Sequence, residues 1–301
     1  MNLQKNRYLV FFTIIAMLMF GEQWLFAEGS ESDRVVVPIA DPSRPVQLRA
    51  HLLNGSITVK GYDGKDVIVE AKVREGDGRG EGEGHGRGRG EGRGSEGRSS
   101  EGRSEGLKRV PMNSTGLSIE AENNQVHVST DSIYRTVDLT LTVPVHSSLS
   151  LHTVNNGNIS VTGVDGELDV NDINGEVTLK NVSGSAVAHA LNGKVLVTFN
   201  RVDAQRAMAF SSMNGDIDVT FPADLKANLS MRSDRGDVYS DFDIQLQAVA
   251  PLSPTVENNQ GKGGKYVVKV EKTVRGTING GGPEIQFKNF NGSIYIRKAA
   301  K

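Results

Sequence analysis

Two pairs of carboxylates have types and spacing that could do chemistry: Glu167 with Asp169, and Asp216 with Asp218. The members of each pair are two residues apart, so on a β-strand they share one face at about 6.6 Å. Carboxylates separated by about 5–9.5 Å can hydrolyse a glycosidic bond. A hydrolase also needs a groove and one carboxyl with a raised pKa, and neither is evident in the sequence. We therefore predict no catalytic residues and keep a polysaccharide-active enzyme using these outward acids as an alternative.

Metal and cofactor patterns are weak in this chain. It has no cysteine, which removes thiolate ligands and disulfides. A calcium-binding nonapeptide repeat carries regular glycines and an aspartate, whereas only Asp165 and Asp172 could contact an ion here. No dinucleotide or phosphate-binding fingerprint is present, so we predict no metal site and no cofactor. None of the six histidines stands at metal-ligand spacing from another: His51, His85, His127, His146, His152 and His189.

The acids belong to a repeat whose glycines recur every nine residues. They stand at Gly157, Gly166, Gly175, Gly184 and Gly193. The second and fourth residues after each glycine are apolar, which is typical of a strand with one buried face. The seventh is also apolar and is expected to re-enter the core beyond a bend, at Val164, Ile173, Val182 and Leu191. The predicted core residues are Ile159, Val161, Leu168, Val170, Val177, Leu179, Val195 and Val197.

The glycines mark the corners between strands. A glycine allows a positive φ, and Asn or Asp before it tolerates the same geometry. Asn precedes the glycine at 157, 175 and 193 but not at 166 and 184, so the corner chemistry repeats every eighteen residues. The Arg-Gly-Asp tripeptide at 235–237 takes the place of a corner, and we attribute it to the repeat. The predicted corners are Gly55, Gly64, Gly157, Gly166, Gly175, Gly184, Gly193, Gly215, Gly236 and Gly292.

This pattern predicts an all-β fold, specifically a right-handed parallel β-solenoid. Units of about nine residues would form coils of about eighteen, and stacking would bury the apolar side of each coil. Asn-Gly between alternating apolar segments is also a hairpin signal. An antiparallel meander sandwich is therefore the alternative, and the pattern alone does not exclude it.

The chain is expected to have four parts. Residues 1–27 are a signal peptide, 28–73 are the N-terminal strands of the solenoid, and 107–301 are the adhesin-like solenoid domain. Between them, 74–106 contains glycine, serine, arginine and acids but no large apolar side chain. Such a composition cannot offset the entropy cost of ordering, so we predict a disordered insertion.

The first residues predict export. Lys5 and Arg7 precede an apolar run at 8–20 that is too short to cross a bilayer, and a small residue, Ala27, follows a more polar tail. Without cysteine the chain cannot be a lipoprotein, and we predict no membrane span after cleavage. The expected location is the periplasm, the cell surface or the extracellular space. Removing residues 1–27, which carry two cations and one anion, changes the net charge from −2 to −3, so we predict no nucleic-acid partner.

Two segments resemble a known family. They are NGNISVTGVDGELDVNDINGEVTLKNVSG at 156–184 and GTINGGGPEIQFKNFNGSIYIRK at 276–298. Their Asn-Gly repeats and Gly-Gly-Gly-Pro-Glu-Ile ending are similar to the toast-rack family of bacterial candidate adhesins, a family of unknown function. The likeness covers roughly 46–72 and 107–300. It implies a β-solenoid in an envelope or extracellular setting and supplies no catalytic residues.

The function predicted from these observations is that of an exported, non-enzymatic, adhesin-like β-solenoid. Its surface would bind an envelope polymer, a protein partner or another copy of itself. The alternatives are the polysaccharide-active enzyme above and an accessory protein of envelope-stress signalling.

Overall fold

The computed structural model describes residues 32–74, 115–130, 135–247, 255–256, 268–269 and 273–300. The chain divides into two units, residues 1–31 and residues 32–301, and only the second is described. The predicted signal peptide, nearly all of the predicted insertion and His85 lie outside the described residues. Within the described part there is no helix, so no helix long and apolar enough to span a membrane is found there.

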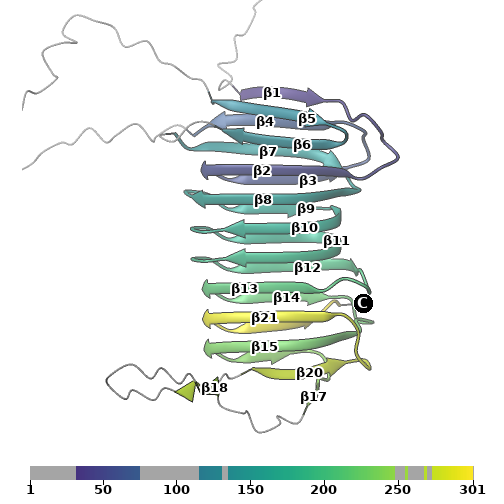
Figure 1. Cartoon of the computed structure of the whole chain (residues 1–301), viewed down its shortest axis with the longest axis vertical. Helices are drawn as coiled ribbons and strands as arrows, with labels where there is room; N and C mark the ends of the chain where they lie inside the picture. The colour runs from purple at the N-terminus through teal and green to yellow at the C-terminus, as the bar shows by residue number, and fades with distance from the viewer. Residues whose placement is uncertain are drawn as a thin grey trace, which may run out of the picture. The chain divides into compact units, whose positions relative to one another are not determined.

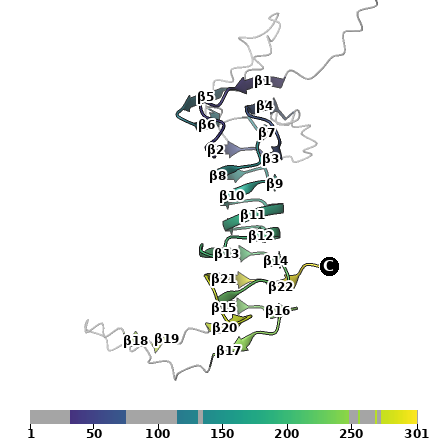
Figure 2. The same ribbon diagram turned by 90° about the vertical axis from the view of Figure 1, so that its right-hand side faces the viewer.

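Two rows of strands face each other across a shared core (Figures 1 and 2). The first row contains, in spatial order, β5 (Leu117–Glu122), β6 (Gln125–Thr130), β2 (Val46–Asn54), β8 (Ser147–Asn155), β10 (Asp165–Asp172), the second half of β11 (Val177–Ala190), β13 (Met208–Asn214), β21 (Glu284–Asn291), β15 (Ala227–Arg235), β20 (Val274–Ile278) and β17 (Gln245–Leu246).

The second row lies opposite. It contains β1 (Ser32–Val37), β4 (Val67–Val73), β7 (Val137–Pro144), β3 (Ile57–Tyr62), β9 (Ile159–Thr162), the first half of β11, β12 (Val195–Val202), β14 (Ile217–Phe221), β22 (Ile294–Lys298) and β16 (Val238–Ser240). A separate two-stranded pair is formed by β18 (Thr255–Val256) and β19 (Val268–Lys269).

The centre of the stack is parallel, with the predicted period. Ile159, Val177 and Val195 pair in direct register, each eighteen residues after the last. The fold is thus all-β and solenoid-like, and the meander alternative is wrong for these coils. The prediction of a purely parallel sheet is also wrong, because antiparallel strands cover both ends: β1, β4 and β5 at one, β20 and β17 at the other. The predicted right-handed coil direction stays a prediction.

The order of the coils in space differs from their order in the chain. The β2–β3 coil lies between β6–β7 and β8–β9, which follow it in sequence. The last coil, β21–β22, lies between β13–β14 and β15–β16. Each end of the stack therefore contains one coil held on both sides by strands distant in sequence. Equivalent repeats present equivalent edges, so the period cannot determine which coil neighbours which.

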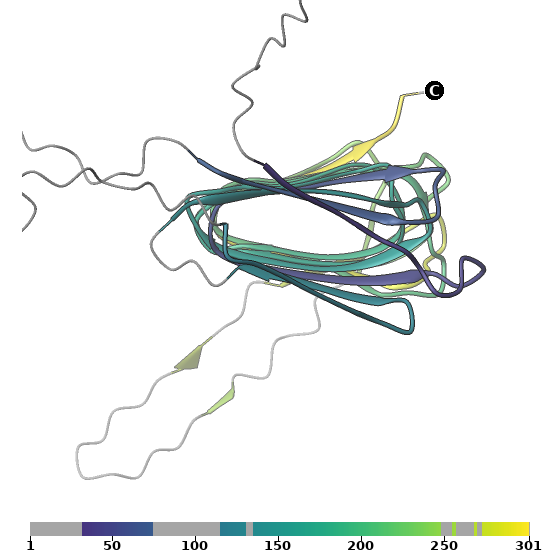
Figure 3. The ribbon, with the colours of Figure 1, turned by 90° about the horizontal axis from the view of Figure 1, so that it is seen from above.

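The core fills the narrow space between the rows, which Figure 3 shows from above. Inward residues alternate with outward ones along each strand, as in β2 and β7. All eight residues predicted for the core are buried. Toward the C-terminal coils the core becomes aromatic: Phe199 stacks on Phe221 and Phe210 stacks on Phe287, each pair with ring centroids 5.4 Å apart.

The seventh residue after each corner glycine, predicted to lie in the core, is buried at only one of the two corner types. Val164 and Val182 are buried, whereas Ile173 and Leu191 are half-buried on the outer face. The reason is that the strand continues its alternation up to the Asn-Gly corner, so Asp172 and Ala190 point inward instead. The outward residues form an apolar stripe that adds one side chain per coil: Leu53, Val154, Ile173, Leu191, Met213 and Phe290.

The corner glycines are needed mainly for close approach of backbones. A Cβ on Gly157, Gly175, Gly193 or Gly215 would overlap the carbonyl of the corner glycine in the neighbouring coil. Positive φ, which the sequence suggested as the reason, occurs in this column only at Gly55 and Gly292.

A ladder of asparagine side chains accompanies the glycine column. Each amide donates from Nδ2 to Oδ1 of the asparagine in the neighbouring coil, at 2.8–2.9 Å. The predicted reason for asparagine, tolerance of positive φ, applies to Asn156, which is not in the ladder. The ladder residues are Asn155, Asn174, Asn192, Asn214 and Asn291.

Replacing Val177 by Asp tests the register. The side chain is fully buried, and an unpaired buried charge should lower the free energy of unfolding by more than about 4 kcal/mol. The control is Glu176→Gln, which should change it by less than about 0.5 kcal/mol because Glu176 faces outward. Urea denaturation measures both, and similar losses would contradict the assigned register.

Replacing Gly175 by Ala tests the close-approach explanation. The new methyl group overlaps the Gly157 carbonyl, so we expect a loss of about 1–3 kcal/mol from forced backbone movement. Gly163 is the control, because it has φ +69 and nothing within 4 Å of an added Cβ. Gly163→Asn should be tolerated, since asparagine adopts positive φ. Equal stability of Gly175→Ala and the native chain in thermal unfolding would refute the explanation.

Candidate functional site

Three of the four predicted acids are engaged by other groups of the chain. Glu167 is paired with Arg206 at 2.6 Å (Oε1 to Nη2), and Asp218 receives Arg297 Nε on both oxygens at 2.7 and 2.9 Å. Asp216 accepts the backbone N–H of Ser293 at 3.0 Å. The arginine contacts of Glu167 and Asp218 occupy carboxylate oxygens that a catalytic acid would offer to a glycosidic bond.

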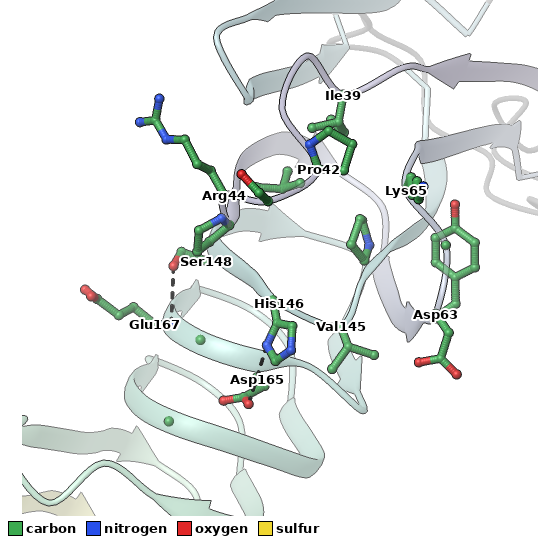
Figure 4. A pocket seen from close by; sticks show the side chains of 18 of the residues that line it. Ile39, Pro42, Arg44, Asp63, Lys65, Val145, His146, Ser148, Asp165 and Glu167 are labelled. Atoms are coloured by element: carbon green, nitrogen blue, oxygen red, sulfur yellow. Dashed lines mark hydrogen bonds and ion pairs between the residues drawn. The ribbon is translucent and has the colours of Figure 1, made fainter.

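A hollow lies at the corner opposite the asparagine ladder, where the N-terminal coils meet (Figure 4). Its volume is about 670 Å³, within the range of small-molecule and cofactor sites. We call it the corner groove. It is lined by the β1–β2 loop, the turn after β3, the β7–β8 connection, the beginning of β10, the middle of β11 and the end of β12. Apolar lining comes from Ile39, Pro42, Pro45, Pro144 and Val145.

One wall of the corner groove, the β1–β2 loop, is fixed by hydrogen bonds. Asp41 accepts both the backbone N–H and the hydroxyl of Ser43, at 3.0 and 2.6 Å. These bonds, the hydroxyl first, lower the pKa of the Asp41 carboxyl. Asn124, buried in the β5–β6 turn, donates to the carbonyls of Asp41 and Arg44 and accepts the N–H of Asp41. A hairpin distant in sequence thus positions this wall.

The opposite wall is the turn after β3. The Tyr62 hydroxyl donates to the Asp66 carbonyl at 2.8 Å and accepts the Asp66 N–H at 3.2 Å. Gly64 lies under the ring, and a Cβ there would overlap it. The structure therefore places Gly64, predicted as a solenoid corner, in the wall of the groove, because the chain turns here into antiparallel β4.

The floor of the corner groove carries an ion-paired carboxylate. Asp165 contacts Arg201 Nη2 at 2.9 Å and His146 Nδ1 at 3.6 Å. At the rim, Arg44 and Lys65 line the groove without an ion pair to any described residue. The groove thus presents apolar walls, two cations at its rim and a mixed set of carboxylates: Asp165 and Glu167, which are ion-paired, and Asp63 and Asp203, which form no ion pair with a described residue.

The remaining predicted candidates are dispersed. Asp165 and Asp172 lie at opposite ends of β10, one in the groove and the other inside the core, so they cannot share a calcium ion. In the Arg-Gly-Asp tripeptide, Arg235 lies over the Phe290 ring and Gly236 joins the glycine column. No group of three or more histidine, cysteine or acidic side chains in the described ranges could hold a metal ion.

Sequence spacing missed one arrangement of histidines. His51 and His152 are opposite each other on β2 and β8, and their rings stack with centroids 5.0 Å apart. His189 belongs to the same outward column, one coil beyond Asn171. The signal was available in the repeat, because Asn171 and His189 both stand five residues after a corner glycine.

Asp172 is the one described carboxyl whose pKa is raised, to about 7, and the cause is burial, offset in part by the Asn174 backbone N–H. It is fully buried, and neither of its oxygens has a hydrogen-bond partner of normal geometry. Facing the interior, it cannot reach a substrate. Asp172 occupies a column of inward residues. Four other members of this column each donate a hydrogen bond to the carbonyl of a corner glycine in the neighbouring coil: Thr153, Ser212, Asn289 and Ser233.

One protein family matches most of the chain, and two solved structures show low similarity to it. The family model described as Toastrack DUF4097 matches residues 16–279. A candidate cell adhesion protein from Clostridium sporogenes is similar in structure at 9% identity, with a TM-score of 0.42 over 89% of this chain and 100% of that one. A candidate adhesin from Bacteroides fragilis shows 12% identity and a TM-score of 0.32, over 90% and 98%. A search among curated proteins finds no match.

Replacing Asp172 by Asn tests its protonation. The folded-state pKa of about 7 exceeds the ordinary 3.8, so unfolding releases a proton above pH 4 and stability falls as pH rises toward 7, by up to about 4 kcal/mol. Asparagine carries a permanent donor, as Asn289 does at the equivalent site. We expect Asp172→Asn to be more stable than the native chain at pH 8 and to lose this pH dependence.

Thermal unfolding between pH 4 and 8 measures the effect. Thr153→Val is the control, because it removes a donor of the same column without a titratable group. It should lower stability equally at all pH values. A native chain whose stability does not fall between pH 4 and 7 would contradict the assigned protonation.

Proposed function

This chain belongs to the Toastrack family, and we propose that it acts as an exported, non-enzymatic, adhesin-like scaffold that binds an envelope polymer in its corner groove. The two structurally similar proteins are named as a candidate cell adhesion protein and a candidate adhesin. Export is supported by the signal-like sequence at 1–27. The periplasm, the cell surface and the extracellular space are all compatible with it.

The observation that carries the proposal is the construction of the corner groove. Its walls are separate loops, each held by its own hydrogen bonds: the Asp41–Asn124 network on one side and the Tyr62–Asp66 pair on the other. A site fixed before binding loses little conformational entropy when its ligand arrives. Since the groove is half open and mixes apolar and charged lining, it suits a segment of a longer polar polymer.

The chemistry of the rim narrows the polymer class. Arg44 and Lys65 form no ion pair with a described residue, while the Asp165 and Glu167 carboxylates are paired with Arg201 and Arg206. The lining also contains Asp63 and Asp203, so the groove offers cations beside carboxylates. A polysaccharide or peptidoglycan strand, which carries hydroxyl groups as well as carboxylate or phosphate groups, fits this mixed distribution. A protein partner or a second copy of the chain would be the alternative occupants.

The enzyme alternative receives less support. Glu167 borders the groove, but its Oε1 atom is paired with Arg206 Nη2. The carboxyl with a raised pKa, Asp172, is inside the core. A Glu167→Gln, Asp169→Asn double variant that abolished a measured glycan-cleaving activity would favour the enzyme over the scaffold.

Charge reversal at the rim tests the scaffold. The mature chain should sediment with purified anionic cell-wall polysaccharide or peptidoglycan, and an Arg44→Glu, Lys65→Glu double variant should bind at least about tenfold more weakly because two attractive contacts become repulsive. Lys60→Glu is the matched control, since Lys60 is exposed on the outer face of β3. Undiminished binding by the double variant would exclude the groove, and no binding by the native chain would exclude this polymer class.

A further inference from the structure

An outward column on the first row brings three imidazoles and one amide together. Parallel register places His51, His152, Asn171 and His189 directly beside one another on β2, β8, β10 and β11. His51 is exposed and the other three are half-buried. Neighbouring members are separated by one strand spacing, about 4.8 Å.

The amide of Asn171 is the unusual member of this column. Its Oδ1 atom is shielded from solvent and has no hydrogen-bond partner, although Asn171 faces outward while its neighbour Asp172 faces the core. A shielded polar atom without a partner is unfavourable. An oxygen in this situation, with an imidazole on each side, is suited to a cation.

The two imidazoles flanking Asn171 are each oriented by a neighbour on the far side. The His51 ring stacks on His152. His189 shares a hydrogen bond of 2.7 Å between its Nδ1 and the Ser211 hydroxyl, which leaves Nε2 available. Metal-binding histidines are commonly held in this way, through the ring nitrogen that does not bind the metal.

We propose that His152, Asn171 and His189 form a surface site for a divalent transition metal ion of the Zn²⁺, Ni²⁺ or Cu²⁺ class. The two histidine Cα atoms are two strand spacings apart, about 9.6 Å. Side chains leaning toward Asn171 from both sides can bring their Nε2 atoms within about 2.1 Å of one ion. Two imidazoles and an amide oxygen match ions of intermediate softness better than Ca²⁺ or Mg²⁺.

Such a site would differ from the corner groove in position and chemistry. It lies on the open face of the first row, and its three ligands come from three successive coils. The ion would therefore link the coils, and its remaining coordination positions would face solvent. A ligand atom from a partner surface could complete them. The inference does not depend on the polymer proposed for the groove.

Calorimetric titration of the tag-free full chain with Zn²⁺, and separately with Ni²⁺, tests the site. We expect one ion per chain, with affinity reduced at least about tenfold by His152→Ala or by His189→Ala. Ser211→Ala should weaken binding about tenfold through loss of ring orientation. Asn171→Asp should keep or increase the affinity, because it retains the oxygen and adds negative charge. His146→Ala and His85→Ala are the controls and should bind as the native chain does.

A spectroscopic measurement separates a bound ion from an effect on folding. Cu²⁺ bound to the native chain should show nitrogen hyperfine coupling from two imidazoles in electron paramagnetic resonance, and His189→Ala should show one. Circular dichroism at the same concentration checks that each variant is folded. The proposal is overturned if the native chain binds neither Zn²⁺ nor Ni²⁺, or if binding survives in the His152→Ala, His189→Ala double variant.

Discussion

The structure depends on the close contact between backbones at the Asn-Gly corner. Each glycine of this corner column lies against a main-chain carbonyl of an adjacent coil so closely that no side chain would fit: Gly55, Gly157, Gly175, Gly193, Gly215 and Gly236. This contact sets the rise of the stack along that edge. The corner carbonyls accept hydrogen bonds from interior hydroxyl and amide groups, such as those of Thr153, Ser212 and Asn289. Steric fit and hydrogen bonding thus impose the same register on successive coils.

The same register also determines how side chains are arranged on the outer surface. Because each coil repeats the previous one, a residue type at one position of the repeat becomes a column on the surface. The asparagine ladder, the apolar stripe and the histidine column all arise in this way, and none needs any loop to form. Residues far apart in the chain, such as His51 and His152, become direct neighbours. A solenoid therefore offers binding groups at a fixed spacing of about 4.8 Å, which is well suited to linear polymers and to ions held between coils.

The ends of the stack follow a different principle. Antiparallel strands such as β1 and β5 cover the N-terminal coils, and β20 and β17 cover one row at the other end. Coils from distant parts of the chain are inserted next to these strands. The insertions place the β1–β2 loop and the turn after β3 against the beginning of β10, and so create the corner groove. The corner groove is thus a product of the irregular end rather than of the repeat.

The amino-acid sequence by itself determined the elements, the eighteen-residue period and the inward residues of the central coils. Val177, Leu179 and their equivalents could be assigned because alternation along a strand is a local property. The tertiary structure decided what depends on contacts between coils. It determined which coil lies beside which, why Gly175 must be glycine, that Ile173 faces outward and Asp172 inward, and that Arg206 neutralises Glu167. Equivalent repeats have interchangeable edges, and the sequence does not show which cation pairs with a given carboxylate. These facts therefore come only from the folded chain.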